Sequence, residues 1–116
     1  MIDMLDVAKT TSDYSKQVIE YLPQLIKEYK EGDITNASTN MLDLLEGIEY
    51  ILKTAFIYED KANIDEAAFS DVLMELKDGM ENSDNRHIAD VLHYEFNPLM
   101  EDLLKKMEKL ISDSLN

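Results

Sequence analysis

The chain has 116 residues, of which 45% are hydrophobic, and it carries a formal net charge of −14. This length fits one domain, and the apolar content is sufficient for a core, which excludes a disordered acidic tail. Phosphate binding needs clustered Lys and Arg, but the chain has only 11 of these against 25 Asp and Glu. We therefore expect neither a nucleic acid nor a membrane as a partner.

The chain contains no cysteine. This excludes disulfides, thiolate nucleophiles and Cys-ligated metals, and it suits a reducing compartment. Near the N-terminus, Asp3 and Asp6 interrupt the apolar residues, so a signal peptide is not expected. No apolar run approaches the roughly 20 residues that cross a bilayer. We expect a cytoplasmic protein.

Residues 1–12 are predicted to form a separate N-terminal segment. Their apolar side chains suit a short amphipathic helix that lies on the rest of the molecule. These side chains are Met1, Ile2, Met4, Leu5 and Ala8. We expect the segment to be loosely docked or mobile, in contrast to a single bundle over residues 13–116.

The first long helix is predicted over residues 13–31, where apolar residues recur at spacings of three and four. Gly32 supplies the permissive position after its last turn. Pro23 lies within the pattern and lacks the amide that would bond to the carbonyl of Ile19. The pattern predicts a kink or a restart there, and whether the helix is continuous through Pro23 stays open.

A second helix is predicted over residues 34–57, with Asp33 as its N-cap. Its apolar stripe spans about six turns, and Leu45, Leu52 and Phe56 widen it. The stripe itself consists of Ile34, Ala37, Met41, Leu44, Ile48, Ile51 and Ala55.

Two further helices are predicted over residues 65–81 and 85–113. Asn63 and Glu66 have the spacing of a capping box before the third helix, and Asp84 is a suitable N-cap for the fourth. Pro98 removes the hydrogen bond to the carbonyl of Tyr94, which predicts a bend in the fourth helix. Because the connections are short, the helices should be antiparallel neighbours in an all-α, up-down-up-down four-helix bundle.

The sequence offers little for catalysis or metal binding. A di-metal bundle needs Glu-x-x-His motifs from two helices, but both histidines, His87 and His93, lie on one predicted helix. Six residues separate them, which places them about 240° apart around the axis. Glycine-rich phosphate loops, EF-hand loops and nucleophile elbows are also missing. We therefore expect no enzyme and no cofactor. A carboxylate and histidine site for a metal or small ligand, using Asp90 and His93, is the alternative.

The seven methionines allow two interpretations. Those on or beside the apolar stripes suit core filling, or they make an adaptable surface for a partner helix. Kinks at Pro23 and Pro98 would open the seams between helices. We expect a non-enzymatic, chaperone-like interaction module that binds an amphipathic helix of a protein partner or self-associates as a homodimer. The candidate partner-binding residues are Ile2, Leu5, Met100 and Met107.

A short charged turn, Lys30 to Asp33, leads into a helix with the apolar residues Ala37, Met41, Leu44, Ile48 and Leu52. This layout resembles the second helix of the bacterial flagellin export chaperones, and the likeness in layout covers most of residues 14 to 113. The resemblance implies a small acidic cytoplasmic four-helix bundle. That family carries a polar leader rich in Gln, Asn and Tyr, which this chain lacks, so no binding residues are carried over. The chain is equally similar to small uncharacterised helical-bundle proteins of Gram-positive bacteria.

Overall fold

The computed structural model describes residues 3–58 and 61–115. It contains α1 (Met4–Glu31), α2 (Ile34–Thr54), a 3₁₀ turn η1 (Ala55–Tyr58), α3 (Glu66–Glu81), α4 (Asn85–Val91), a π turn η2 (Leu92–Phe96) and α5 (Asn97–Leu115). α4, η2 and α5 follow one another without a gap and form the fourth rod of the bundle. The described residues contain no strand.

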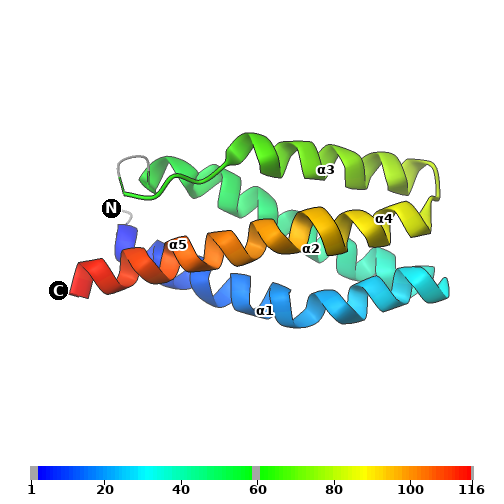
Figure 1. Ribbon diagram of the computed structural model, residues 1–116, viewed down its shortest axis with the longest axis horizontal. Coiled ribbons are helices and arrows are strands. Elements are labelled where there is room, and N and C mark those ends of the chain that lie inside the picture. The colour runs from blue at the N-terminus through cyan, green and yellow to red at the C-terminus, as the bar shows by residue number, and fades with distance from the viewer. Residues whose placement is uncertain (1–2, 59–60, 116) are drawn as a thin grey trace.

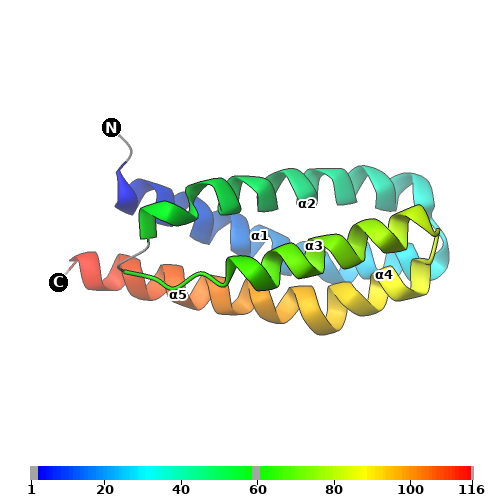
Figure 2. The same ribbon diagram turned by 90° about the horizontal axis from the view of Figure 1, so that it is seen from above.

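The predicted all-α, up-down-up-down four-helix bundle is confirmed (Figures 1 and 2). α1 packs along α2 and also along the fourth rod, and α3 packs against α4 and η2. Among neighbouring helices, α2 and α3 make the least extensive contact. The bundle is elongated, with extents of 47 × 24 × 23 Å, because its helices lie side by side along one axis.

The core lies along this axis and is built from the apolar stripes of all four rods. Residues at spacings of three and four point inward together, which removes most of their surface from water. The largest fully buried side chains include Leu22, Leu25, Met41, Ile48, Tyr58, Leu76, Phe96, Met100 and Leu103.

Helix α1 begins at Met4, and the predicted boundary near residue 13 is wrong. Asp3 caps it by accepting a hydrogen bond from the backbone amide of Leu5 at 2.9 Å. Ala8 and Thr11 are fully buried, and the Thr11 hydroxyl lies 3.4 Å from the hydroxyl of Tyr58 in η1. The segment over residues 4–12 is therefore part of the bundle. The sequence predicted a separate helix here because the residues that join it to the bundle, Thr11, Ser12 and Ser15, are small and polar yet buried.

Met1 and Ile2 lie outside the described residues.

The helix termini follow the predicted caps in part. Gly32 adopts the left-handed conformation, with φ 76°, and Asp84 caps α4 by accepting from the amide of His87 at 3.1 Å. Asp33 occupies the N-cap of α2 but makes no side-chain cap bond there. The predicted capping box is wrong, because the N-cap of α3 is Asp65, which accepts from the amide of Ala68 at 3.0 Å.

The two prolines have different effects on their helices. α1 is continuous through Pro23, which lies exposed on its surface, so no restart occurs. In the fourth rod, the π turn immediately precedes Pro98, and the amide of Asn97 donates to the carbonyl of Leu92, five residues back. A wider turn is a known way to accommodate a residue that cannot continue the ordinary hydrogen-bond ladder. The sequence predicted a bend at Pro98, and the structure has a π turn immediately before it.

Candidate functional site

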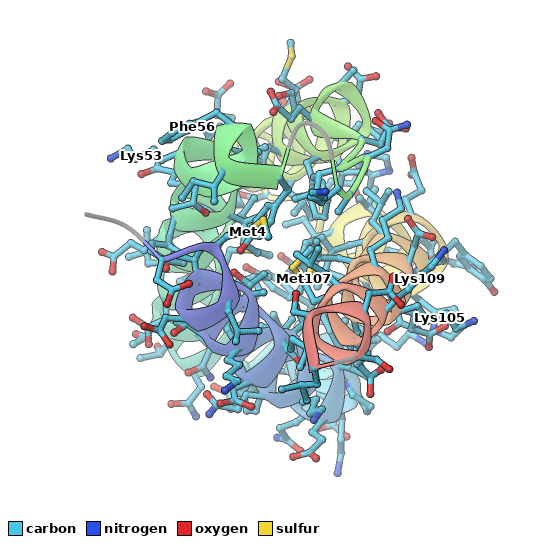
Figure 3. All side chains as sticks on the ribbon, turned by 90° about the vertical axis from the view of Figure 1, so that its left-hand side faces the viewer. Met4, Lys53, Phe56, Lys105, Met107 and Lys109 are labelled. Atoms are coloured by element: carbon cyan, nitrogen blue, oxygen red, sulfur yellow. The ribbon has the colours of Figure 1, made fainter. Side chains whose placement is uncertain are left out.

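Two of the predicted partner-binding residues lie in the core. Met100 and Met107 are both 0% exposed, and Met107 points to the interior between the helices, as Met4 does (Figure 3). Their predicted contact with a partner is therefore wrong, since no partner reaches them in the folded bundle. Leu5 is half-buried and its role stays a prediction, whereas Ile2 lies outside the described residues.

The alternative site of Asp90 and His93 is not assembled into a cluster. Both side chains are exposed, and the His93 ring meets the neighbouring Tyr94 ring edge-on, with centroids 4.5 Å apart. Within residues 3–58 and 61–115, no three His, Asp or Glu side chains are grouped closely enough to hold a metal ion.

Helix α2 and η1 carry a second, mainly apolar stripe that the core covers only in part. Leu42 is 57% exposed and Phe56 is 60% exposed, while Leu45 and Leu52 are half-buried. Phe56 follows α2 in η1 and points outward at one end of the bundle (Figure 3). With Glu49, these residues recur at alternating spacings of three and four, which places them on one helix face. We name Leu42, Leu45, Glu49, Leu52 and Phe56 the second stripe.

The second stripe lies on the side of α2 that faces α3. Gly47 marks the opposite side, since its backbone lies against the ring of Tyr14 in α1. Leu45 lies two residues from Gly47, which is about 200° around the helix axis. The stripe therefore borders the seam between α2 and α3, the neighbouring helices with the least extensive contact.

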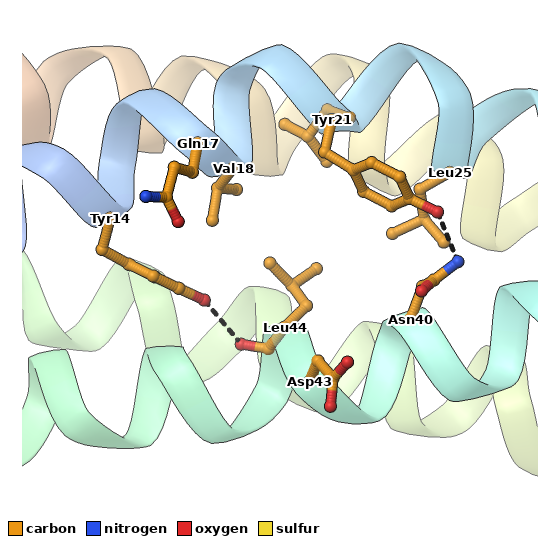
Figure 4. A pocket seen from close by; sticks show the side chains of 9 residues that line it. Tyr14, Gln17, Val18, Tyr21, Leu25, Asn40, Asp43 and Leu44 are labelled. Atoms are coloured by element: carbon orange, nitrogen blue, oxygen red, sulfur yellow. Dashed lines mark hydrogen bonds between the residues drawn. The ribbon is translucent and has the colours of Figure 1, made fainter.

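A groove of about 220 Å³ lies on the other side of α2, between this helix and α1. Its floor is apolar and consists of Val18, Leu22, Leu25 and Leu44. Tyr14 and Tyr21 stand at opposite ends of its opening, with Leu44 between them, as Figure 4 shows. A preformed apolar cavity bordered by a few polar groups is the usual form of a small-ligand site.

Tyr14 is held firmly at its end of the groove. Its hydroxyl donates to the carbonyl of Leu44 at 3.2 Å, and its ring occupies the space beside Gly47 that a β-carbon would fill. Burial raises the pKa of Tyr14 to about 12, with a further contribution from the charge of Asp43. Tyr14 thus remains a neutral hydrogen-bond donor at any physiological pH.

Behind the other end of the groove lies a buried carboxylate, Glu28, which is 7% exposed. The hydroxyl of Tyr21 donates to it at 3.1 Å, and the side-chain amide of Asn40 donates to it at 3.1 Å. Asn40 also donates to the Tyr21 hydroxyl (Figure 4). Burial raises the pKa of Tyr21, and the hydrogen bond to Glu28 adds to the rise. These neutral donors supply hydrogen bonds to the carboxyl group but bring no positive charge to it.

A second cavity, of about 450 Å³, lies where α1 passes the fourth rod. Pro23 lines it from α1, and His93 and Asn97 line it from the π turn and the start of α5. Pro23 and the π turn therefore lie at the same level of the bundle.

Sequence reasoning missed the buried position of Glu28 and the role of Gly47. Glu28 lies in a run of charged residues that reads as a solvated surface, so no local signal distinguished it. Gly47 had a usable signal, because glycine within a strongly helical pattern is destabilising and often marks a close approach.

None of the helices in the described part of the chain has the length and apolar character needed to cross a membrane. A search of curated proteins and a search of solved structures found no significant match to the chain. Residues 6–106 match the sequence pattern of the family described as domain of unknown function DUF8042, and the chain therefore belongs to that family.

Proposed function

We propose that this protein is a non-enzymatic interaction module whose second stripe on α2 binds an amphipathic helix with basic side chains. The observation that carries the proposal is the exposure of Leu42 and Phe56, at 57% and 60%, on one face with two half-buried leucines. A soluble monomer has little reason to place large apolar residues in such an ordered row on its surface, and a partner helix would cover them.

The spacing of the second stripe specifies the shape of the partner. Alternating steps of three and four residues form the seam of a coiled coil, in which side chains of one helix fit between those of the other. Burying a large aliphatic or aromatic side chain contributes about 1.5–3 kcal/mol, whereas an exposed ion pair contributes about 0–1 kcal/mol. The apolar residues would therefore supply most of the affinity.

Charge favours a basic partner over a second copy of the chain. Glu49 lies within the second stripe and Glu46 is exposed beside it. Two copies would bring together net charges of −14 each, which opposes self-association. A lysine or arginine of the partner, placed opposite Glu49, would pair with it and fix the register of the two helices.

A photo-crosslinking residue at position 42, introduced in native cells, tests this proposal. The matched control carries the same residue at Lys109, which points outward from α5 (Figure 3). We expect a protein to be captured at position 42 and not at 109, with capture lost after Phe56→Glu. Mass spectrometry should find a basic amphipathic helix in the captured protein. Equal capture at both positions, or capture of this chain alone, would contradict the proposal. Circular dichroism confirms that each variant is folded.

A further inference from the structure

We infer that the groove between α1 and α2 binds an aliphatic ammonium group, either on a small amine or on a lysine side chain. This site is separate from the second stripe, which lies on the opposite side of α2, so the inference does not depend on the proposed function. Three independent features support it: the shape of the floor, the charge around the groove and the residues that border its opening.

The floor and size of the groove suit a short aliphatic chain. Val18, Leu22, Leu25 and Leu44 present only apolar side chains. The volume of about 220 Å³ lies below the about 300–1,000 Å³ of sites for drug-sized molecules, so the ligand is a small one. A chain of a few methylene groups would bury its surface there, with about 0.8 kcal/mol for each buried CH₂.

The electrostatics of the groove favour a positive charge. Asp43 lines the groove on the α2 side, and the nine residues that line it include no Lys, Arg or His. Glu28 adds a second negative charge directly behind Tyr21 and Asn40, which both line the groove. Since Glu28 is buried, water and salt screen its field less than that of a surface carboxylate. A cation in the groove would therefore interact with both carboxylates.

The opening of the groove is lined by aromatic rings and hydrogen-bond acceptors, which can take the place of the water molecules around an ammonium ion. Tyr14 and Tyr21 stand at its two ends, and aromatic rings attract cations through their quadrupole. The side-chain amide of Gln17 projects toward the opening from α1 (Figure 4). An ammonium group has three donors, for which the Asp43 carboxylate and the Gln17 amide oxygen are suitable acceptors.

NMR titration of the ¹⁵N-labelled full chain with n-butylamine at neutral pH tests the inference, with 1-butanol as the neutral probe of equal chain length. We expect saturable shifts in the amides of Tyr14, Tyr21, Asn40 and Leu44 with the amine and much smaller ones with the alcohol. Equal shifts with both probes, or shifts that do not saturate, would overturn the inference.

Charge-removing variants test the assigned carboxylates. Asp43→Asn should weaken amine binding by about two- to fivefold, the range expected for one partly exposed ion pair. The matched control is Asp71→Asn, an exposed aspartate on α3, which should leave the affinity unchanged. If Asp43→Asn binds the amine as well as the parent chain does, the assignment is wrong. Asp43 is exposed, so its substitution is compatible with folding.

A second titration distinguishes the two sources of the ammonium group. The probe is a lysine blocked at both ends, which represents a lysine side chain within a protein. Tighter binding of this probe than of n-butylamine assigns the groove to a protein lysine, and weaker binding assigns it to a small free amine. Binding of neither probe overturns the inference, whatever the crosslinking at position 42 shows.

Discussion

The ring of Tyr14 lies directly against the backbone of Gly47, so that α1 and α2 meet through a tyrosine on one helix and a missing side chain on the other. A β-carbon on Gly47 would lie 1.8 Å from the Tyr14 hydroxyl oxygen, far closer than any real contact. The same hydroxyl donates to the carbonyl of Leu44, one turn before Gly47. The glycine thus positions the tyrosine that closes one end of the groove.

Gly47→Ala should destabilise the bundle by about 1–3 kcal/mol, because the new methyl group forces Tyr14 out of its place. A loss of stability would be informative, because replacing glycine by alanine within a helix normally raises the free energy of unfolding by about 1 kcal/mol. Urea unfolding measures the change in the free energy of unfolding. In a Tyr14→Ala background the same substitution should become stabilising. An equal effect in both backgrounds would disprove the contact.

Met100→Ala and Met107→Ala should each lower the free energy of unfolding by about 2–5 kcal/mol, as expected for cavities in a packed core. Both side chains are fully buried. The matched control is Met74→Ala, since Met74 is largely exposed and its loss should change stability by less than about 0.5 kcal/mol. Thermal and urea unfolding provide the measurement. A small effect at both positions would contradict their burial in the packed core.

Pro23→Ala should stabilise the protein, by up to about 3 kcal/mol, because an amide at position 23 can donate to the carbonyl of Ile19. Pro23 lies exposed within a continuous helix, so its removal leaves no cavity in the core. Gln24→Ala, at the next exposed position, controls for the general effect of alanine in a helix. A loss of stability would show that Pro23 makes a packing contribution in the cavity between α1 and the fourth rod.

Stability should fall at alkaline pH through the tyrosines. Burial raises the pKa of Tyr14 to about 12 and also raises the pKa values of Tyr21, Tyr29 and Tyr58. In the unfolded chain each tyrosine titrates near pH 10, so the unfolded state loses its protons first. The stability that is fully present below about pH 10 is therefore lost as the pH rises toward about 12.

Urea unfolding at several pH values, with tyrosinate absorbance as the titration signal, checks this dependence. Tyr14→Phe should reduce the slope of stability against pH in the alkaline range, although it loses the hydrogen bond to Leu44 at every pH. An unchanged slope in this variant would mean that Tyr14 titrates normally in the folded protein.

Glu95→Gln should raise stability slightly at neutral pH, by up to about 0.5 kcal/mol, as is typical of surface substitutions. A hydrogen bond with the carboxyl group of Glu75 on α3 raises the pKa of Glu95, burial and the Glu75 charge add to the rise, and His87 opposes it. A raised pKa means that ionisation is less favourable in the folded state. Stability is therefore greater below the unfolded pKa and falls as the pH rises through the folded value.

The difference between Glu95→Gln and the parent chain should consequently grow from acid to neutral pH, as measured by urea unfolding. Glu108→Gln, an exposed position on α5, is the matched control and should show no such growth. A constant difference across this range would show that Glu75 does not raise the pKa of Glu95.

Periodicity alone determined the architecture of this protein. Four apolar stripes with spacings of three and four, separated by short polar connections, are compatible with few arrangements other than an antiparallel bundle. Gly32 and Asp84 marked helix ends correctly because the left-handed turn and the N-cap depend on local chemistry that a sequence displays directly.

Tertiary contacts decided what periodicity could not. The apolar pattern of residues 4–8 predicted a short helix, but it did not show that this helix continues into the bundle through polar Thr11, which is buried with its hydroxyl beside that of Tyr58. Glu28 reads as a surface charge until Tyr21 and Asn40 converge on it from two helices. A helical pattern specifies which face of each helix is buried. Which side chains meet across two helices depends on the relative rotation and register of those helices, and only packing sets these.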